Sequence, residues 1–325
     1  MNFLTHRTKR IAYGAGLALF GLLNLSAFMH AWRMTRFVAA GARTAAPESL
    51  SRLRKAVVLM TGVRIPKPVN DRDPAAFGLE FRAVEIPCPG GPTLAGWHLD
   101  LTSAPGTIVM CHGYATSKSS LLAESAVFQA LGWRVLLLDF RGCGDSPGRT
   151  TTLGAAESAD VVAALAWVRA RAPQERVVLF GASMGAAAVL RALAATEDIE
   201  PPAGIILERP FDRLLTTVRH RFSAMGLPSF PAAHLLVFWG GLQCGFNGFA
   251  HNPAEYARQV TCPALVLHGG RDPRVSVSEA GSVARNLGGR SEVHVFEEIA
   301  HRSYCDVAPD RYRAVLAAWL AERAR

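Results

Sequence analysis

Residues 176–185 read Arg-Val-Val-Leu-Phe-Gly-Ala-Ser-Met-Gly, and this stretch decides the fold. The apolar run 177–180 predicts a buried strand. The G-x-S-x-G pattern that follows places Ser183 between two glycines, where the missing side chains let neighbouring elements pass close by. Residues 186–195 are then rich in strong helix formers. A strand, a sharp turn that carries a serine and a helix form a nucleophile elbow, so we expect Ser183 at the tip of a strained turn.

The same rhythm of strands and helices continues on both sides of this stretch. Upstream, two strands at 82–86 and 93–101 flank a turn rich in Pro and Gly, which predicts an antiparallel hairpin. Further strands are predicted at 107–111, 135–139, 177–180, 204–207, 264–268 and 292–296, and helices at 118–131, 155–171, 186–195, 276–287 and 310–322. Such alternation predicts an α/β fold, with a mostly parallel central sheet and helices on both faces.

Composition and charge limit the classes of partner. The chain has 325 residues, of which 50% are hydrophobic, enough for one large domain with additions or for two domains. The net charge is +9, and the first 50 residues hold six Lys and Arg against one acidic residue. No basic cluster with interleaved aromatic residues follows, so we expect no nucleic-acid partner. The basic excess beside an apolar stretch points to a membrane surface.

The N-terminal region predicts a membrane anchor. Residues 11–32 are 22 consecutive uncharged residues, and about 20 helical residues cross a bilayer core. Tyr13 and Trp32 lie near the two ends, where interfacial aromatic residues are favoured. We therefore assign 1–36 to a basic N-terminus and a transmembrane helix, in a single-pass protein of a membrane such as the bacterial inner membrane. Basic residues flank both ends, so the side of the catalytic domain stays open.

Two other interpretations of this region are a cleaved signal peptide and a peripheral or buried helix. The basic segment 7–10 before the apolar run fits a signal peptide, but the run is long and no A-x-A cleavage site follows it. Residues 37–80 are predicted to be a linker. Its segment 49–61 has apolar residues near helical spacing, as in an amphipathic helix packed on the main domain or lying on a membrane.

The main domain is expected to span 81–325. Residues 211–260 interrupt the strand–helix rhythm with many aromatic residues, several glycines and prolines. They predict a lid over a binding pocket, because such a pocket needs an apolar lining. The alternative is an elaborated crossover without that role.

An exposed serine needs a base, and the base needs an acid to fix its tautomer. For a nucleophile elbow the expected order along the chain is Ser, then Asp or Glu, then His. Asp272 follows the strand predicted at 264–268, and His301 follows the one at 292–296. Catalytic groups gather at the carboxyl ends of parallel strands. We therefore predict a triad of Ser183, Asp272 and His301. The alternative is that the match is due to chance and that each of these residues is an ordinary residue of a surface loop.

A tetrahedral intermediate also needs an oxyanion hole. One donor is expected to be the backbone N–H of Met184, directly after the nucleophile. The second is expected from the loop after the strand at 107–111, where Gly113 lets the backbone approach and Tyr114 supplies its N–H.

Other polar residues near strand ends are interpreted as structural. His112 and His268 are expected to brace loops, and Asp139 and Arg141 to form a structural pair upstream of the nucleophile. Asp306 lies after the histidine, in the wrong order for the catalytic acid. Six cysteines are present without a C-x-x-C pair, which argues against a zinc or thioredoxin-type site and leaves disulfides open.

From about residue 81 to its end the chain resembles the α/β-hydrolase superfamily. The resemblance rests on His-Gly-Tyr at 112–114, Asp-Phe-Arg-Gly-x-Gly-x-Ser at 139–146, Gly-Ala-Ser-Met-Gly at 181–185, Gly-Gly-Arg-Asp at 269–272 and the late His301. It looks most like the membrane-anchored Bem46-like and ABHD-type serine hydrolases. This resemblance implies hydrolysis of ester, thioester or lipid-ester bonds without a metal or cofactor. The family often has a proline where this chain has Ser276, a departure that leaves Asp272 in place.

These observations predict an α/β-hydrolase fold with an N-terminal transmembrane helix and a serine hydrolase activity on an acyl or lipid ester. Two alternatives remain at this stage: a peptidase or amidase of the same fold, and a binding protein that keeps the scaffold without catalysis.

Overall fold

The computed structural model describes residues 6–45, 49–196 and 200–324. Within them, eight strands form one sheet in the order β1-β2-β4-β3-β5-β6-β7-β8. The strands are β1 (Arg82–Ile86), β2 (Leu94–Leu99), β3 (Gly106–Cys111), β4 (Arg134–Leu138), β5 (Arg176–Ala182), β6 (Gly204–Glu208), β7 (Ala264–Gly269) and β8 (Ser291–Phe296). The predicted β1–β2 hairpin is antiparallel, β2 also pairs antiparallel with β4, and the other neighbours are parallel.

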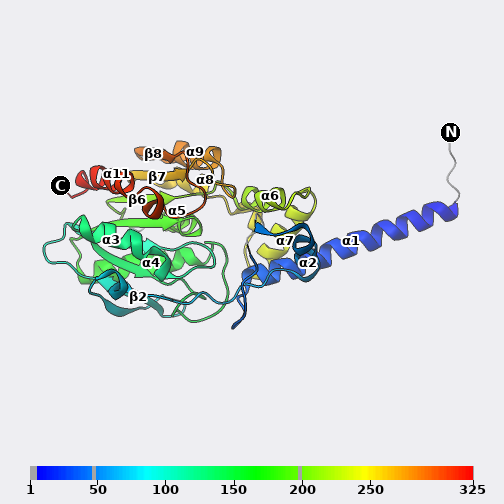
Figure 1. Ribbon diagram of the computed structural model, residues 1–325, viewed down its shortest axis with the longest axis horizontal. Coiled ribbons are helices and arrows are strands. Elements are labelled where there is room, and N and C mark those ends of the chain that lie inside the picture. The colour runs from blue at the N-terminus through cyan, green and yellow to red at the C-terminus, as the bar shows by residue number, and fades with distance from the viewer. Residues whose placement is uncertain (1–5, 46–48, 197–199, 325) are drawn as a thin grey trace.

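Helices cover both faces of the sheet (Figure 1). One face packs against α3 (Leu122–Ala130) and α11 (Pro309–Ala321), and the other against α4 (Glu157–Arg171), α5 (Met184–Ala195) and α9 (Val277–Asn286). The split follows from the strand period of two. In β5, Val177 and Leu179 belong to the core under α4, while Val178 and Phe180 belong to the core under α3. The α/β fold predicted from alternation is confirmed.

Short helices complete the connections. They are η2 (Pro74–Phe77), η3 (Lys118–Leu121), η4 (Gly248–Ala250), α8 (Pro253–Tyr256), η5 (Ala257–Gln259) and α10 (Tyr304–Val307). The helix predicted at 118–131 thus begins as a 3-10 turn. All six cysteines are free thiols, so no disulfide joins them in this structure.

Four further helices gather beyond the carboxyl edge of the sheet, and we call them the cap (Figure 1). They are α1 (His6–Thr35), α2 (Arg52–Thr61), α6 (Leu214–Met225) and α7 (Ala232–Cys244). Helix α7 packs on both α1 and α6. Most of α1 projects away from the molecule, on the side opposite the C-terminus. By length and composition α1 can cross a membrane, with a candidate span at Arg10–Thr35. Helices α6 and α7 of the predicted lid 211–260 therefore lie in one cluster with the N-terminal helices α1 and α2. The role of 211–260 as a lid stays a prediction.

Candidate active site

Ser183 lies at the turn between β5 and α5. Its backbone has φ 54° and ψ −109°, a conformation that residues with side chains rarely adopt. Two glycines make the turn sterically feasible: a Cβ on Gly181 would lie 2.6 Å from backbone atoms of α5, and one on Gly185 would lie 2.2 Å from the carbonyl oxygen of Cys111. The Ser183 N–H donates to the Glu208 carbonyl oxygen at 2.7 Å. The strained strand–turn–helix predicted from the sequence is present at the carboxyl edge.

Asp272 and His301 meet at the same edge. Asp272 follows β7 and His301 follows β8, and His301 Nδ1 lies 2.6 Å from Asp272 Oδ2. The Asp272 side chain is fully buried, and the His301 side chain is 14% exposed. The other carboxylate oxygen of Asp272 accepts the backbone N–H groups of Arg274 at 2.8 Å and Val275 at 3.1 Å. Three contacts thus fix the carboxylate, and with it the orientation of the imidazole.

The electrostatics favour a neutral imidazole beside a carboxylate. Burial lowers the pKa of His301 more than the hydrogen bond and charge of Asp272 raise it. Burial would raise the pKa of Asp272, but the hydrogen bond and charge of His301 and the two N–H donors outweigh it and hold that pKa below its usual value. A neutral imidazole can accept a proton, which is the state a general base needs.

No hydrogen bond joins the Ser183 hydroxyl to His301 in this structure, although both residues lie in its described part. Such bonds are often long in unliganded sites and tighten when substrate binds. The structure therefore pairs two of the three predicted triad residues and leaves the third at the same edge. The assignment of all three as a triad stays a prediction.

The loop after β3 lies against Ser183. A Cβ on Gly113 would be 3.8 Å from the Ser183 Cβ, an ordinary van der Waals distance, so the loop lies close to Ser183 but does not require glycine at this position. The Tyr114 phenol donates to the Met34 carbonyl oxygen of α1 at 2.6 Å, which fixes the loop to the cap. Among backbone hydrogen bonds of the described residues, none uses the N–H of Tyr114 or Met184 as donor. Both groups remain available to the role predicted for them.

His112 braces this loop, as predicted. Its Nδ1–H donates to the Gly113 carbonyl oxygen at 2.8 Å, and its Nε2 accepts the Phe140 N–H at 3.2 Å. Burial lowers the pKa of His112, which keeps the imidazole neutral for both contacts. His268 has a similar role, since its Nε2 lies 3.1 Å from the carbonyl oxygen of Val275 in the Asp272 loop.

The predicted pairing of Asp139 with Arg141 is wrong. Asp139 contacts the buried Lys118, whose Nζ lies 2.5 Å from its Oδ2. Arg141 instead contacts Asp160 on α4 at 2.5 Å. The two side chains leave the loop after β4 in different directions, one toward η3 and the other toward α4. Both are structural, but each binds a partner distant in sequence.

A cluster of buried charged side chains beside the His301 loop was not predicted from the sequence. Arg209 has φ 52°, and its guanidinium donates to the Arg302 carbonyl oxygen at 2.5 Å. It also lies 3.0 Å from Glu208, whose other oxygen accepts the Tyr312 hydroxyl at 2.7 Å. Burial raises the pKa of Glu208 despite these partners. Arg209 therefore ties the end of β6 to the loop that carries His301.

Glu124 on α3 completes this buried group. It accepts the Ser303 hydroxyl at 2.6 Å, and its second oxygen is buried without a partner in the described chain. Burial, and then the charge of Glu208, raise the pKa of Glu124 to about 7. The signal in the sequence was the charged pair Glu208-Arg209 directly after the apolar strand 204–207, at the expected catalytic edge.

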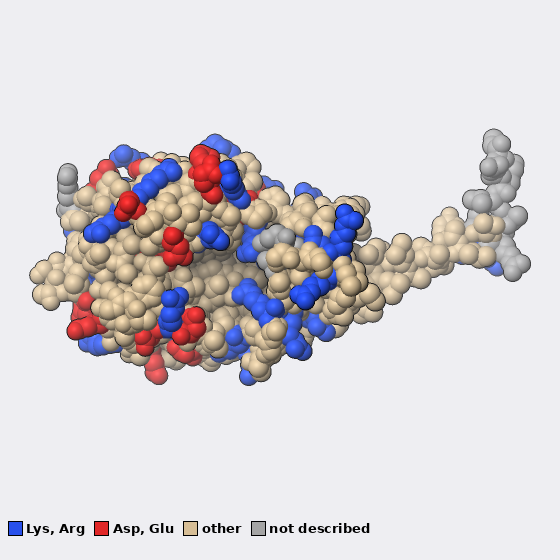
Figure 2. Space-filling model, in the orientation of Figure 1, with Lys and Arg blue, Asp and Glu red and all other residues tan. Residues whose placement is uncertain are grey.

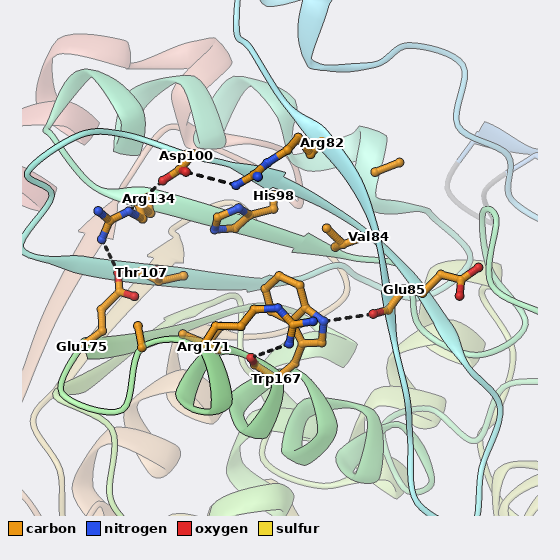
Figure 3. A pocket seen from close by; sticks show the side chains of 13 residues that line it. Arg82, Val84, Glu85, His98, Asp100, Thr107, Arg134, Trp167, Arg171 and Glu175 are labelled. Carbon is orange, nitrogen blue, oxygen red and sulfur yellow. Dashed lines mark hydrogen bonds and ion pairs between the residues drawn. The ribbon is translucent and has the colours of Figure 1, made fainter.

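A cavity lies at the amino edge of the sheet, opposite the edge that holds Ser183 (Figure 3). It has a volume of about 570 Å³ and contains none of the predicted site residues. Four of its charged side chains are paired: Asp100 lies 3.1 Å from Arg82 and 2.9 Å from Arg134, which lies 2.8 Å from Glu175. The Trp167 indole N–H donates to a backbone carbonyl of β1.

Comparisons with known proteins agree with this architecture. A family model described as the alpha/beta hydrolase fold matches residues 106–204. An uncharacterized protein of Bacillus subtilis is 26% identical over 69% of this chain and 73% of its own length. The lysophosphatidylserine lipase ABHD12 of Macaca fascicularis is 30% identical over 55% of this chain, which spans 45% of the lipase. The esterase Pf2001 of Pyrococcus furiosus superimposes with a TM-score of 0.65 at 23% identity, covering 80% of this chain and 99% of the esterase.

These likenesses have different weight. The match to the esterase is below 25% identity and shows the fold alone, while ABHD12 shares sequence over about half its length with this chain. The strand order, the strained serine turn and the family match agree with one another. The chain has the α/β-hydrolase fold, and its residues 106–204 match the family model of that fold.

Proposed function

We propose that this protein is a membrane-anchored serine hydrolase that cleaves acyl ester or thioester bonds. Ser183 is the nucleophile, His301 the general base and then the general acid, and Asp272 the residue that orients His301. The observation that carries the proposal is the hydrogen bond of 2.6 Å between Asp272 and His301, at the edge where the strained Ser183 turn ends β5.

The first half-reaction forms an acyl-enzyme. Ser183 Oγ attacks the carbonyl carbon while its proton passes to His301 Nε2. Asp272 keeps Nδ1 protonated, so Nε2 carries the lone pair that accepts this proton. The carbonyl oxygen becomes an oxyanion that accepts the N–H groups of Met184 and Tyr114. Collapse of this intermediate breaks the ester bond, and His301 returns the proton to the departing alcohol or thiol.

The second half-reaction releases the acid. A water molecule attacks the acyl carbon and gives a proton to His301 Nε2. The same N–H groups stabilise the second oxyanion, whose collapse breaks the bond to Ser183 Oγ. His301 then returns its proton to the serine. The cycle consumes one ester and one water, and it needs no metal or cofactor.

The substrate class follows from the location of the site. The Tyr114 loop is hydrogen bonded to the end of α1, the helix long enough to cross a membrane. The curated relative ABHD12 is named as a lysophosphatidylserine lipase. A lipid with an acyl ester is therefore the first substrate to test, with 1–36 as the anchor, 81–325 as the hydrolase domain and 211–260 as its lid.

Labelling by a fluorophosphonate probe tests this proposal. The full chain is compared with Ser183→Ala and His301→Ala, and matched controls are Ser158→Ala on α4 and His294→Ala on β8. We expect labelling of the wild type and both controls, and its loss in the two site variants. Equal labelling of Ser183→Ala, or no labelling of folded wild type in lipid vesicles, would refute the assignment.

A further inference from the structure

Helix α1 is longer than the part of it that stands clear of the protein. All twelve residues from 11 to 22 are exposed, whereas Ala27 and Ala31 are buried against the rest of the chain. Twelve helical residues rise about 18 Å, while the hydrocarbon core of a bilayer is about 30 Å thick. A membrane span must therefore include the part of α1 that is packed against the cap.

Helix α7 lies beside that part of α1. The Trp239 indole N–H donates to the Asn24 amide oxygen at 3.2 Å, and the Gln243 amide donates to the Phe28 carbonyl oxygen at 2.9 Å. The rings of Phe28 and Trp239 meet edge to face at 5.4 Å. Polar groups within a membrane need partners in the protein, and here α7 supplies the partner of Asn24. The contact brings α7 to the depth at which α1 crosses the core.

The outer side of α7 is suited to lipid. The helix contains no Asp, Glu, Lys or Arg. Its exposed side carries Phe238, 48% exposed, and Leu242, 62% exposed, which are one turn apart on the same face. A helix that is apolar on all sides is normally buried in a protein core or in a membrane. In this structure no other described element covers that face.

Helix α2 presents a second apolar stripe. Leu53, Val57 and Met60 follow one another at helical spacing and are 76%, 50% and 88% exposed. The helix has three basic residues, no acidic one and no buried residue. This combination is typical of a helix that lies in a membrane interface. His30 of α1 contacts the Leu59 carbonyl oxygen at 3.0 Å, so α2 lies beside α1 as well.

Charge on the cap complements an anionic lipid surface. Neither α1, α2, α6 nor α7 contains an acidic residue. Figure 2 shows Lys and Arg gathered around the base of α1, while the acidic side chains visible on this face lie over the sheet. Basic residues near a membrane surface are attracted to anionic lipids.

We propose that α2 and the outer face of α7 are embedded in the membrane leaflet beside α1, with lipid as their occupant. Helix α1 then spans the bilayer, and α7 flanks the part of α1 that contains Asn24 and Phe28. Helix α2 lies in the headgroup region, with its apolar stripe in the acyl chains. The inference rests on α1 as the membrane span in the proposed function, and it does not depend on the proposed chemistry.

Depth-dependent fluorescence quenching tests the proposal on the full chain. The protein is reconstituted into vesicles of phosphatidylcholine and phosphatidylglycerol, with an NBD label at Met60→Cys or Leu242→Cys. Matched controls are Val293→Cys and Val307→Cys, each an exposed valine, 44% accessible, on the sheet domain. A label at Leu19→Cys on α1 reports the span itself, and labelled parent protein gives the background from native cysteines.

We expect doxyl-labelled lipids to quench positions 60, 242 and 19 by about two-fold or more, and to leave 293 and 307 unchanged. Quenching at 19 without quenching at 60 and 242 would overturn the embedded cap, and energy transfer between labels at 242 would assign that face to a second copy. No quenching at 19 would remove the span on which the inference rests. The readout needs no turnover, so Ser183→Ala should give the same depths even if the proposed chemistry fails.

Discussion

The two edges of the sheet differ in what they hold. Of the five residues other than glycine with positive φ in the described chain, three follow strands at the carboxyl edge: Ala115 after β3, Ser183 after β5 and Arg209 after β6. One buried oxygen of Glu124 at this edge has no hydrogen-bond partner within the described residues, while the carboxylate of Glu208 is held by Arg209 and Tyr312. The amino edge holds a cavity in which Arg82, Asp100, Arg134 and Glu175 form ion pairs (Figure 3).

Backbone strain therefore distinguishes the candidate site from the amino edge of the sheet. Backbone strain and unsatisfied polar groups persist only where the surrounding structure enforces them, and they concentrate at functional sites. A groove with paired surface charges needs no such enforcement. We therefore expect substitutions at the carboxyl edge to change catalysis and stability strongly, and matched substitutions at the amino edge to change little.

The largest contrast is expected in turnover. Removing the nucleophile or the base by Ser183→Ala or His301→Ala should lower kcat for an acyl ester by about 10⁴-fold to 10⁶-fold. Glu175→Gln at the amino edge should leave kcat within about two-fold, because its carboxylate contacts Arg134 and Thr107 at the edge opposite the proposed site. Steady-state kinetics on all three variants measures the contrast. A fall in kcat at Glu175→Gln as large as at Ser183→Ala would contradict an active site at the carboxyl edge of the sheet.

The acid residue gives a somewhat smaller effect. Asp272→Asn keeps the shape of the side chain but removes the charge that fixes the Nδ1–H tautomer, so kcat should fall by about 10⁴-fold. Asp306→Asn is the matched control, since Asp306 lies after the histidine in the chain and should leave kcat unchanged. Equal activity of Asp272→Asn and wild type would exclude this residue as the catalytic acid.

Stability should respond to the buried arginine. Arg209→Gln leaves Glu208 without its ion-pair partner, and breaking such a buried pair lowers the free energy of unfolding by about 3–5 kcal/mol. Arg134→Gln removes two partly exposed ion pairs, with Asp100 and Glu175, and should lower the free energy of unfolding by about 1 kcal/mol or less. Urea denaturation measures both. Similar losses of unfolding free energy in the two variants would contradict the expectation that the buried ion pair at the carboxyl edge contributes more stability than the exposed ones at the amino edge.

The pKa of Glu124 predicts a stability that depends on pH. Its pKa of about 7 in the folded state lies above the usual value of 4.5, so the folded state binds more protons than the unfolded state between these pH values. Stability from this group is therefore present at pH 4.5 and declines as pH rises toward 7. Glu124→Gln should unfold at a higher temperature than wild type at pH 8, with a smaller gain at pH 5. A constant difference in melting temperature across this window would contradict the buried neutral carboxyl.

A smaller effect is expected in the pH profile. Because burial lowers the pKa of His301 from its usual 6.5, this histidine stays neutral as pH falls through 6.5. The acid limb of kcat/KM should thus have its midpoint below 6.5. Its measurement with a substrate that does not titrate in this range checks the shift, and a midpoint at or above 6.5 would count against it.

Much of the fold could be predicted because its signals are local. Buried parallel strands are continuous apolar runs, and the turn at Ser183 is marked by two glycines within five residues. Asp272 and His301 could be predicted for a related reason. Each follows a parallel strand, and the carboxyl ends of parallel strands lie at the same edge of the sheet. The topology then places their loops together although 29 residues separate them.

The missed features depend on contacts between distant residues. Lys118 and Asp139 are separated by 21 positions, and Glu124 and Ser303 by 179. The cap depends on Asn24 and Trp239, which are 215 positions apart. No period or motif in the sequence connects such pairs, so the buried ion pairs, the Arg209 contact and the joining of α1 to α7 required the structure.

Trapping the acyl-enzyme tests the central claim most directly. The full chain in vesicles is mixed with a p-nitrophenyl acyl ester, quenched in acid during turnover and analysed by intact mass and peptide mapping. The account predicts one acyl group per chain, located on Ser183, and none on Ser183→Ala. An acyl group on another residue, or turnover without any covalent intermediate, would contradict a serine nucleophile at the carboxyl edge.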